Sequence, residues 1–198
     1  FKEYDDLEFV KKFSVLLLKT RFLFDQYVIK RKYEGETDEW SMLKLKYYPK
    51  EEDRKQESTG YVNAFGGEDS NQDSQNKQAL MLLAMFNVST PTQNYKHWLT
   101  AVLYYLVTQP KLEVEYYNQY LEDLARKFFF DRFMVEDSYS QQRYEDMVFL
   151  SPKEIKGLEN WQVNKELLRY QQIRNNLVFN YLDYLIWRDN EDSRIKQF

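Results

Sequence analysis

The pattern of hydrophobic and polar positions predicts a chain built mainly of helices. Over residues 6–31, apolar side chains recur at alternating intervals of four and three residues, which places them on one stripe of a helix. The stripe consists of Phe9, Phe13, Leu16, Thr20, Leu23 and Tyr27. The same reasoning predicts further helices over residues 76–88, 92–109, 112–133 and 164–187.

Three shorter segments depart from that pattern. Residues 40–48 alternate in part, which predicts a short strand or an extended arm. Residues 50–77 are polar and contain three of the glycines, so they are predicted to form a flexible polar insertion. The tetrapeptide SPKE predicts a helix start, with Ser151 as the cap, Pro152 at the first helical position and Glu154 closing a capping box.

The last predicted helix, over residues 164–187, is apolar on two adjacent faces. Leu177, Tyr181 and Leu185 lie near one line, and Leu182 and Ile186 widen it. A helix of this kind has to be covered on two sides, so it is predicted to be the central helix of a bundle. The predicted fold class is therefore all-α: an irregular bundle of about five or six helices in a single domain over residues 1–198, with one long polar loop.

Composition narrows the chemistry that the chain can carry. Its 198 residues contain no cysteine and one histidine, which excludes disulfides, thiolate nucleophiles and cysteine-based zinc sites. The net charge of −4 gives no support for a dedicated nucleic-acid-binding domain. We expect no cofactor, no membrane span and a cytoplasmic location. Because the chain starts at Phe1 without an initiator methionine, we expect a fragment of a larger protein.

The sequence contains no residue pattern that gives strong support for a catalytic site. The carboxylate pairs Glu122-Asp123, Glu136-Asp137 and Glu145-Asp146 are adjacent in sequence, and adjacent residues on a helix point about 100° apart. The spacing Glu-x-x-His that suits helical metal sites is absent. His97 has no partner pattern and is interpreted as a half-buried or surface helix residue rather than a general base or ligand. No catalytic residue is predicted.

Basic and aromatic residues alternate in three segments, RFLFDQYVIKRKY, YKHW and LARKFFFDRF. Such a mixture can hold phosphates and stack bases. The alternative is that the stems of long basic side chains pack over an aromatic core while their charged heads stay in water. If a DNA-binding face exists, we predict that it uses Arg21, Lys30, Arg31, Lys32, Lys96 and His97.

Four segments resemble the central helical region of GmrSD-type, modification-dependent restriction endonucleases. These are TRFLFDQYVIKRK, LMLLAMFNVSTPTQNYKHWL, YLEDLARKFFFDRF and IRNNLVFNYLDYLIW. The resemblance implies a ParB-like, nucleotide-hydrolysing domain before this region and a His–Asn–His nuclease domain after it. Gln141-Gln142-Arg143 lacks the Asp-Gly that opens the family motif, so it is interpreted as coincidence. No catalytic residue of the family maps onto this chain.

Three hypotheses follow. The first is a non-catalytic helical connector or DNA-engagement region of a GmrSD-like restriction or phage-defence protein. Its partners would be the adjacent domains of its parent, and DNA through that parent. The second is a helical module that binds another protein. The third, an enzyme with a carboxylate site, lacks the ligand spacings it would need.

Overall fold

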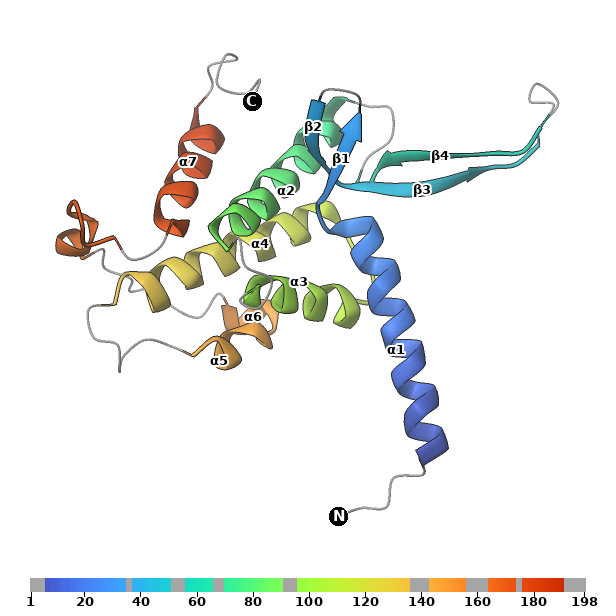
Figure 1. Ribbon diagram of the computed structural model, residues 1–198, viewed down its shortest axis with the longest axis horizontal. Helices are drawn as coiled ribbons and strands as arrows, with labels where there is room; N and C mark the ends of the chain where they lie inside the picture. Colours follow the sequence, from blue (N-terminus) through green and yellow to red (C-terminus); the bar gives the residue numbers. More distant parts are fainter. Residues whose placement is uncertain are drawn as a thin grey trace.

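The computed structural model describes residues 6–34, 37–50, 56–65, 70–90, 96–135, 143–155, 164–173 and 176–190. These residues are mainly helical and carry two small antiparallel sheets (Figure 1). The α-helices are α1 (Asp6–Tyr27), α2 (Ser70–Ser89), α3 (His97–Thr108), α4 (Val114–Phe128), α5 (Tyr144–Val148), α6 (Pro152–Ile155) and α7 (Leu177–Asp189). A π-helix, η2 (Phe129–Phe133), continues α4, and a 3₁₀ helix, η3 (Lys165–Leu168), precedes α7. The strands are β1 (Lys30–Glu34), β2 (Thr37–Ser41), β3 (Leu43–Tyr48) and β4 (Ser58–Asn63).

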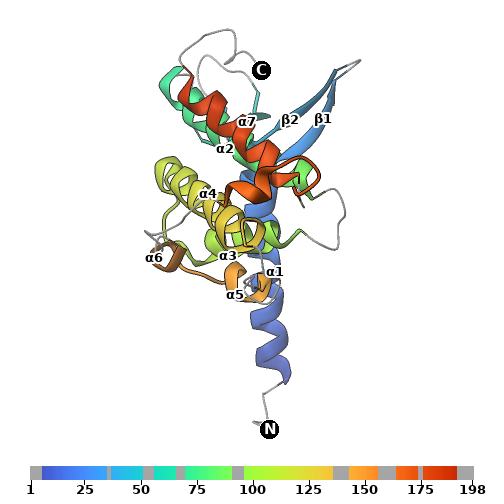
Figure 2. The same ribbon diagram turned by 90° about the vertical axis from the view of Figure 1, so that its left-hand side faces the viewer.

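The core is centred on α4. This helix contacts α2 and α6, while α2 contacts α7, and α3 lies between α1 and α5 (Figures 1 and 2). The helix predicted over residues 112–133 carries apolar residues at three- and four-residue intervals, the spacing of a helix–helix seam: Val114, Tyr117, Leu121, Leu124 and Phe128. The last four of these residues are buried and Val114 is half-buried, which agrees with that spacing.

Tyrosine hydroxyls fix α4 to its neighbours. The Tyr117 hydroxyl donates to the Tyr27 carbonyl at 2.9 Å, and the Tyr120 hydroxyl donates to the Ala101 carbonyl at 3.0 Å. The rings of Tyr105 and Tyr120 stack with centroids 4.1 Å apart. Each aromatic side chain thus buries a large apolar area while its polar end remains hydrogen-bonded.

The two sheets are antiparallel hairpins that follow α1. In the first, Lys30 pairs with Ser41 and Glu34 with Thr37. In the second, Leu43 pairs with Asn63 and Tyr48 with Ser58, and this ribbon extends away from the helical body (Figure 1). We call β3 and β4 together the arm.

The strand signal over residues 40–48 is confirmed but divided between the two hairpins. Met42, only 1% exposed, separates β2 from β3, and its carbonyl accepts a hydrogen bond from the Ala64 amide at 3.0 Å. These sheets correct the all-α prediction: the molecule is mainly helical, with two small sheets.

The structure also differs from the polar insertion expected over residues 50–77. It places β4 at Ser58–Asn63 and begins α2 at Ser70, and the Asn76 side chain accepts from the Phe65 amide at 3.2 Å. β4 has a weak hydrophobic pattern, and its backbone groups are satisfied by pairing with β3. That pairing is not visible in the local sequence.

The last predicted helix is interrupted. The Asn164 side chain accepts from the Glu166 amide at 3.0 Å and caps η3, and Gln171 then has φ of 67°. This left-handed conformation cannot continue a right-handed helix, so α7 begins only at Leu177. The helix is also peripheral rather than central: Phe179, Leu182 and Ile186 are about half exposed.

The boundaries of the other predicted helices can be compared with the local sequence at three places. α1 ends at Tyr27, four residues earlier than predicted, because the chain turns into β1 at Lys30. Pro110 follows the end of α3, as expected of a residue that cannot donate to the helix. The Ser151 amide donates to Glu154 Oε2 at 2.7 Å, which confirms the carboxylate half of the capping box.

Candidate functional site

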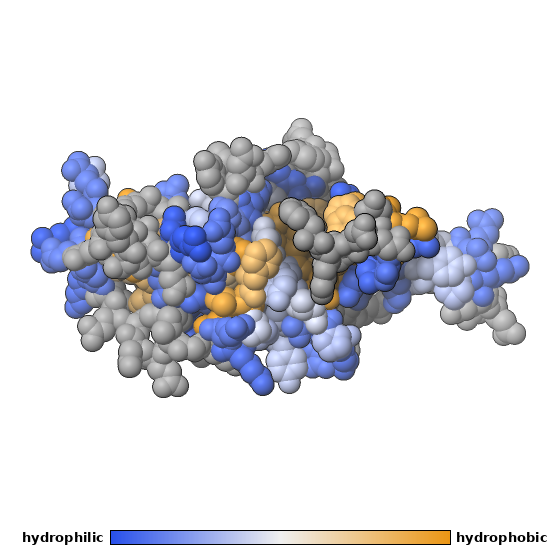
Figure 3. All heavy atoms as spheres, turned by 90° about the horizontal axis from the view of Figure 1, so that it is seen from below, coloured by the Kyte–Doolittle hydropathy of each residue, from blue (hydrophilic) through white to orange (hydrophobic). Residues whose placement is uncertain are grey.

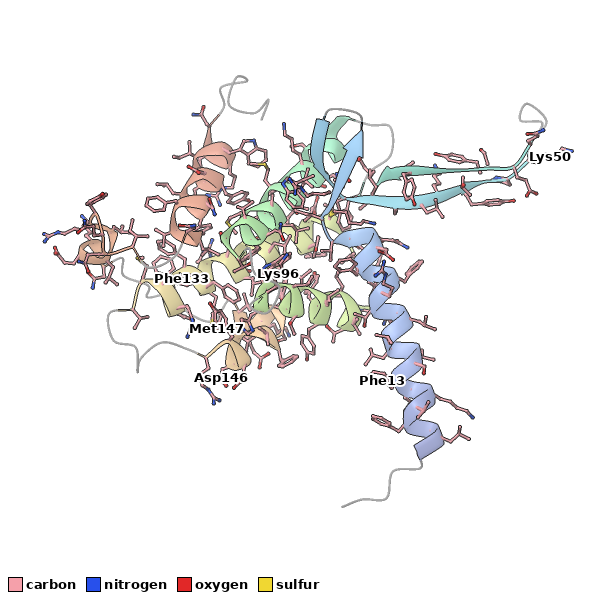
Figure 4. The ribbon with its side chains drawn as sticks, viewed as in Figure 1. Phe13, Lys50, Lys96, Phe133, Asp146 and Met147 are labelled. Carbon is pink, nitrogen blue, oxygen red and sulfur yellow. The ribbon has the colours of Figure 1, made fainter. Side chains whose placement is uncertain are left out.

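Helix α1 exposes an unusually large apolar surface. Its N-terminal part projects from the body, with Phe13 on the projecting part (Figures 1 and 4). Nine large hydrophobic side chains on it are between 49% and 70% exposed. They are Leu7, Phe9, Val10, Phe13, Val15, Leu16, Leu17, Leu18 and Phe22. We call these nine residues the α1 apolar surface; a contiguous surface of this kind marks an interaction site.

The polar positions along the α1 apolar surface are mostly basic. Lys11, Lys12, Lys19 and Arg21 stand against one carboxylate, Glu8, between Leu7 and Phe22. Lys12 pairs with Glu8 at 2.6 Å, and Lys19 donates to the Val107 carbonyl of α3 at 2.9 Å. Only toward its C-terminal end, at Leu23, Phe24 and Tyr27, does α1 pack against the core.

A smaller apolar stripe lies on α7. Leu177, Val178, Tyr181 and Tyr184 are buried on the inner side of the helix. Phe179, Leu182 and Ile186 recur three and four residues apart on the outer side, and they are 51%, 52% and 49% exposed. Two helices of the chain therefore carry apolar faces that the described residues leave in contact with water.

The six residues predicted for DNA binding do not form one surface. Arg21, Lys30 and Arg31 lie together where α1 gives way to β1, whereas Lys96 and His97 lie at the start of α3. α3 reaches α1 near Val107, ten residues, or roughly 15 Å of helix, beyond His97. Lys32 lies in β1 opposite Glu39, and its side chain is outside the described residues.

The first group surrounds Asp25 and Trp40. Arg21 Nε donates to Asp25 Oδ2 at 2.8 Å, and the Lys30 ammonium donates to the Asp25 carbonyl. The Arg31 guanidinium lies over the Trp40 ring, 5.4 Å from its centroid. The side chains of Lys30 and Arg31 are thereby held at the base of the arm.

A pocket opens beside these two cations. It has a volume of about 190 Å³ and is lined by Lys30, Arg31, Ser41, Leu43 and Tyr61. The lining residues comprise two basic residues, two that carry hydroxyls and one that is apolar, a composition that suits an anionic group attached to a flat or apolar one. We call it the arm pocket. Sequence reasoning predicted the two cations but missed Tyr61, because Tyr61 is brought to them by strand pairing.

The second group is less suited to binding an anion. Lys96 donates to Asn87 Oδ1 at 2.6 Å, and the His97 ring stacks on Tyr144 with centroids 4.1 Å apart. Arg132 also lies over the Tyr144 ring, at 4.3 Å. Desolvation, followed by the charge of Arg132, lowers the pKa of His97, although Glu145 opposes the shift. This shift favours the neutral imidazole, which adds no positive charge to the group.

The carboxylates of the core have structural partners. Glu122 Oε1 accepts from the Tyr184 hydroxyl at 2.5 Å and from Gln78 at 3.1 Å. Burial, reinforced by Glu122, raises the pKa of Tyr184 well above its usual value. Asp123 instead accepts from Gln119 at 3.1 Å. Glu122 and Asp123 thus bind different partners, as the helical geometry predicted, whereas Glu145 and Asp146 both pair with Arg143. The pair Glu136-Asp137 lies outside the described residues.

A buried ion pair was missed by sequence reasoning. Lys127 and Asp131 lie 2.6 Å apart, their side chains are 6% and 9% exposed, and they bridge α4 and the π-helix η2. Their spacing of four residues was the available signal, but a solvated pair has the same spacing.

In the parts of the chain that the structure describes, no group of three or more His, Asp or Glu side chains is placed to hold a metal ion.

No helix among the described residues is both long and apolar enough to cross a membrane. Comparison with known proteins finds no matching family model, no matching curated protein and no matching solved structure.

Proposed function

We propose that the chain is a non-catalytic helical connector of a larger, cytoplasmic, GmrSD-like restriction or phage-defence protein. The observation that carries this proposal is the α1 apolar surface. Full burial of one leucine or phenylalanine is worth roughly 1.5–3 kcal/mol, so nine half-exposed side chains favour packing against neighbouring protein. In a connector, that neighbour is an adjacent domain of the parent protein.

The buried polar groups support a structural role. Lys127 and Asp131 neutralise each other, and Glu122 is engaged by Tyr184, Gln78 and Arg188. Groups bound in this way hold helices together, and a reaction at Glu122 would first have to break those bonds. Coupling between two flanking domains requires a rigid body of this type.

The alternative is an independent helical module that binds a separate protein. The same α1 apolar surface would serve it, and only the identity of the occupant differs. If the occupant belongs to the parent chain, α1 is covered in the intact protein from the start. If the occupant is a separate protein, α1 stays exposed until that protein is added.

Hydrogen exchange on the intact parent protein separates these cases. We expect amides of residues 7–22 to exchange at least tenfold more slowly in the parent than in the 198-residue chain. Leu18→Asp, at a side chain 70% exposed, should abolish that protection without unfolding the isolated chain. Tyr170→Asp, at a side chain 91% exposed, is the matched control. Equal exchange in the two proteins would contradict the connector.

A second candidate role, DNA engagement, is favoured by one specific observation. The arm pocket gathers Lys30 and Arg31 beside an exposed tyrosine at the base of a projecting ribbon. This role is compatible with the connector because the arm and the projecting part of α1 are separate surfaces (Figure 1).

A further inference from the structure

We infer that the arm binds single-stranded nucleic acid, with a phosphate at the arm pocket and bases stacked on Tyr61 and Tyr47. This inference deepens the proposed DNA-engagement role and rests on it. It does not depend on what covers α1. Four features of the arm carry it: the division of its two faces, the exposure of its tyrosines, the continuity of the pocket with one face, and its charge.

Strand register divides the arm into two chemically different faces. Successive residues of a strand point to opposite faces, and Leu45 pairs with Tyr61 while Tyr47 pairs with Thr59. Leu43, Leu45, Tyr47, Thr59 and Tyr61 therefore share one face, the aromatic face. Lys44, Lys46 and Tyr48 share the other face with Gly60 and Val62.

The aromatic face is open to solvent. Tyr61 is 70% exposed, Leu45 59% and Tyr47 56%. Tyr61 and Tyr47 occupy diagonal positions across the two strands, a separation of about 7–8 Å. Two tyrosine rings at this spacing offer successive π-faces on which the bases of an extended single strand can stack.

The arm pocket opens directly onto the aromatic face. Leu43 and Tyr61 belong to both, so the cations and the stacking rings form one continuous surface. The Lys30 ammonium is anchored by the Asp25 carbonyl and the Arg31 guanidinium lies over the Trp40 ring, and both residues line the pocket together with Tyr61. A phosphate in the pocket would therefore place its attached base on the tyrosine.

The charge of the arm favours a polyanion. Over residues 41–63 the sequence contains five basic residues against four carboxylates, a net charge of +1: Lys44, Lys46, Lys50, Arg54 and Lys55 against Glu51, Glu52, Asp53 and Glu57. Lys50 lies toward the far end of the ribbon (Figure 4). Seen from below, the arm is mostly hydrophilic, and hydrophobic residues gather beside its base (Figure 3). A local basic surface on a chain of net charge −4 steers an anion to the arm.

A single strand fits this surface better than a duplex. The tyrosines can stack only on bases that are unpaired and turned outward, and a duplex keeps its bases inside. A single strand can use the exposed tyrosine rings and the basic residues at the base of the arm together, through stacking and phosphate contacts.

The test uses the 198-residue chain and fluorescence anisotropy with a labelled deoxythymidine oligomer of about 12 nucleotides. A duplex of the same length is the comparison ligand. We expect the single strand to bind at least about tenfold more tightly than the duplex. Tyr47→Ala with Tyr61→Ala should weaken single-strand binding by at least about tenfold and leave the salt dependence unchanged. Tyr61→Phe should retain binding, because stacking needs the ring and not the hydroxyl.

A second pair of variants tests the phosphate site. Lys30→Gln with Arg31→Gln should weaken binding and reduce the slope of log K against log salt by about 0.7, the value for one phosphate contact on a single strand. Tyr170→Ala and Lys153→Gln are controls at exposed positions away from the arm. Circular dichroism spectra of all variants confirm that the arm variants remain folded.

Three results would overturn the inference. They are absence of binding at low salt, tighter binding of the duplex with no effect of the tyrosine variants, and equal losses in arm and control variants. If the arm variants instead abolish capture of a protein domain of the parent, the aromatic face is a protein-docking surface and the inference fails. The hydrogen-exchange test on α1 is unaffected by each of these outcomes, so the two proposals fail separately.

Discussion

Helices α1 and α4 have similar hydrophobic patterns but differ in how far their apolar side chains are buried. Both carry an apolar residue every three or four positions. Nine of the fifteen residues of α4 are buried, whereas nine large hydrophobic side chains of α1 are about half exposed or more. The difference arises because α4 lies against α2, α3 and α6, while α1 meets α3 and β3 mainly toward its C-terminal end. A periodic pattern shows that an apolar face exists but does not say which element covers it.

The largest expected effect on stability comes from removing one lysine of an ion pair, which can be compared between α4 and α1. Lys127→Ala in α4 removes the partner of the buried Asp131 carboxylate, which should lower the free energy of unfolding by about 3–5 kcal/mol. Lys12→Ala in α1 removes an exposed pair and should cost less than about 0.5 kcal/mol. Urea denaturation followed by circular dichroism measures both. Lys127→Met combined with Asp131→Leu should recover most of the loss; similar costs for the two single variants would refute the contrast.

The second-largest difference in stability between α4 and α1 variants is expected when a large apolar side chain is shortened. Leu121→Ala in α4, at a side chain with no exposure, should destabilise the chain by about 2–5 kcal/mol. Leu16→Ala in α1, at a side chain 49% exposed, should change stability by no more than about 0.5 kcal/mol. Chemical denaturation at two protein concentrations is the measurement. A cost for Leu16→Ala that grows with protein concentration would show that α1 is already covered by self-association.

Alkaline pH should weaken the core around α3 and α4. Burial raises the pKa of Tyr105 to about 12, and it raises the pKa values of Tyr117 and Tyr120 as well. A raised pKa in the folded state means that the native protein holds its proton more tightly. The stabilisation is therefore complete below about pH 10 and is lost as the pH rises towards 12, at up to about 1.4 kcal/mol per pH unit for Tyr105.

Urea denaturation between pH 8 and pH 11 tests this dependence. Tyr105→Phe should reduce the loss above pH 10 by up to about 1.4 kcal/mol per pH unit, because phenylalanine has no proton to release, while Tyr117 and Tyr120 continue to contribute. Tyr170→Phe, at a side chain 91% exposed, serves as the control and should leave the profile unchanged. A profile that is flat in the unmodified chain would contradict the burial of these hydroxyls.

The smallest expected effects compare the two faces of α7. Tyr184→Phe removes the hydrogen bond to Glu122 on the inner face and should cost about 1 kcal/mol. Leu182→Ser, on the outer face and 52% exposed, should change stability by less than about 0.5 kcal/mol. Thermal unfolding can resolve both if the melting temperature is measured to about one degree. A large loss from Leu182→Ser would restore the prediction that both faces of this helix are covered.

Local signals were sufficient for much of the fold. The positions of α1, α3 and α4 follow the helical period, and Pro110 and the Ser151–Glu154 box mark helix boundaries. The divergence of Glu122 and Asp123 also follows from the geometry of one helix. The amino-acid sequence determined these features by itself because the interactions involved join residues no more than four positions apart.

Tertiary structure decided the features that join distant residues. β4 exists because β3 pairs with it, and that pairing brings Tyr61 beside Lys30 and Arg31, about thirty positions earlier in the chain. The left-handed Gln171 divides a helix that the pattern had continued. Whether an apolar face is covered likewise depends on residues far away in the sequence. Neighbouring helices cover the apolar face of α4, whereas the described residues leave much of the α1 apolar surface exposed to solvent. Periodicity records the side chains of one segment, whereas burial is a property of two segments in contact.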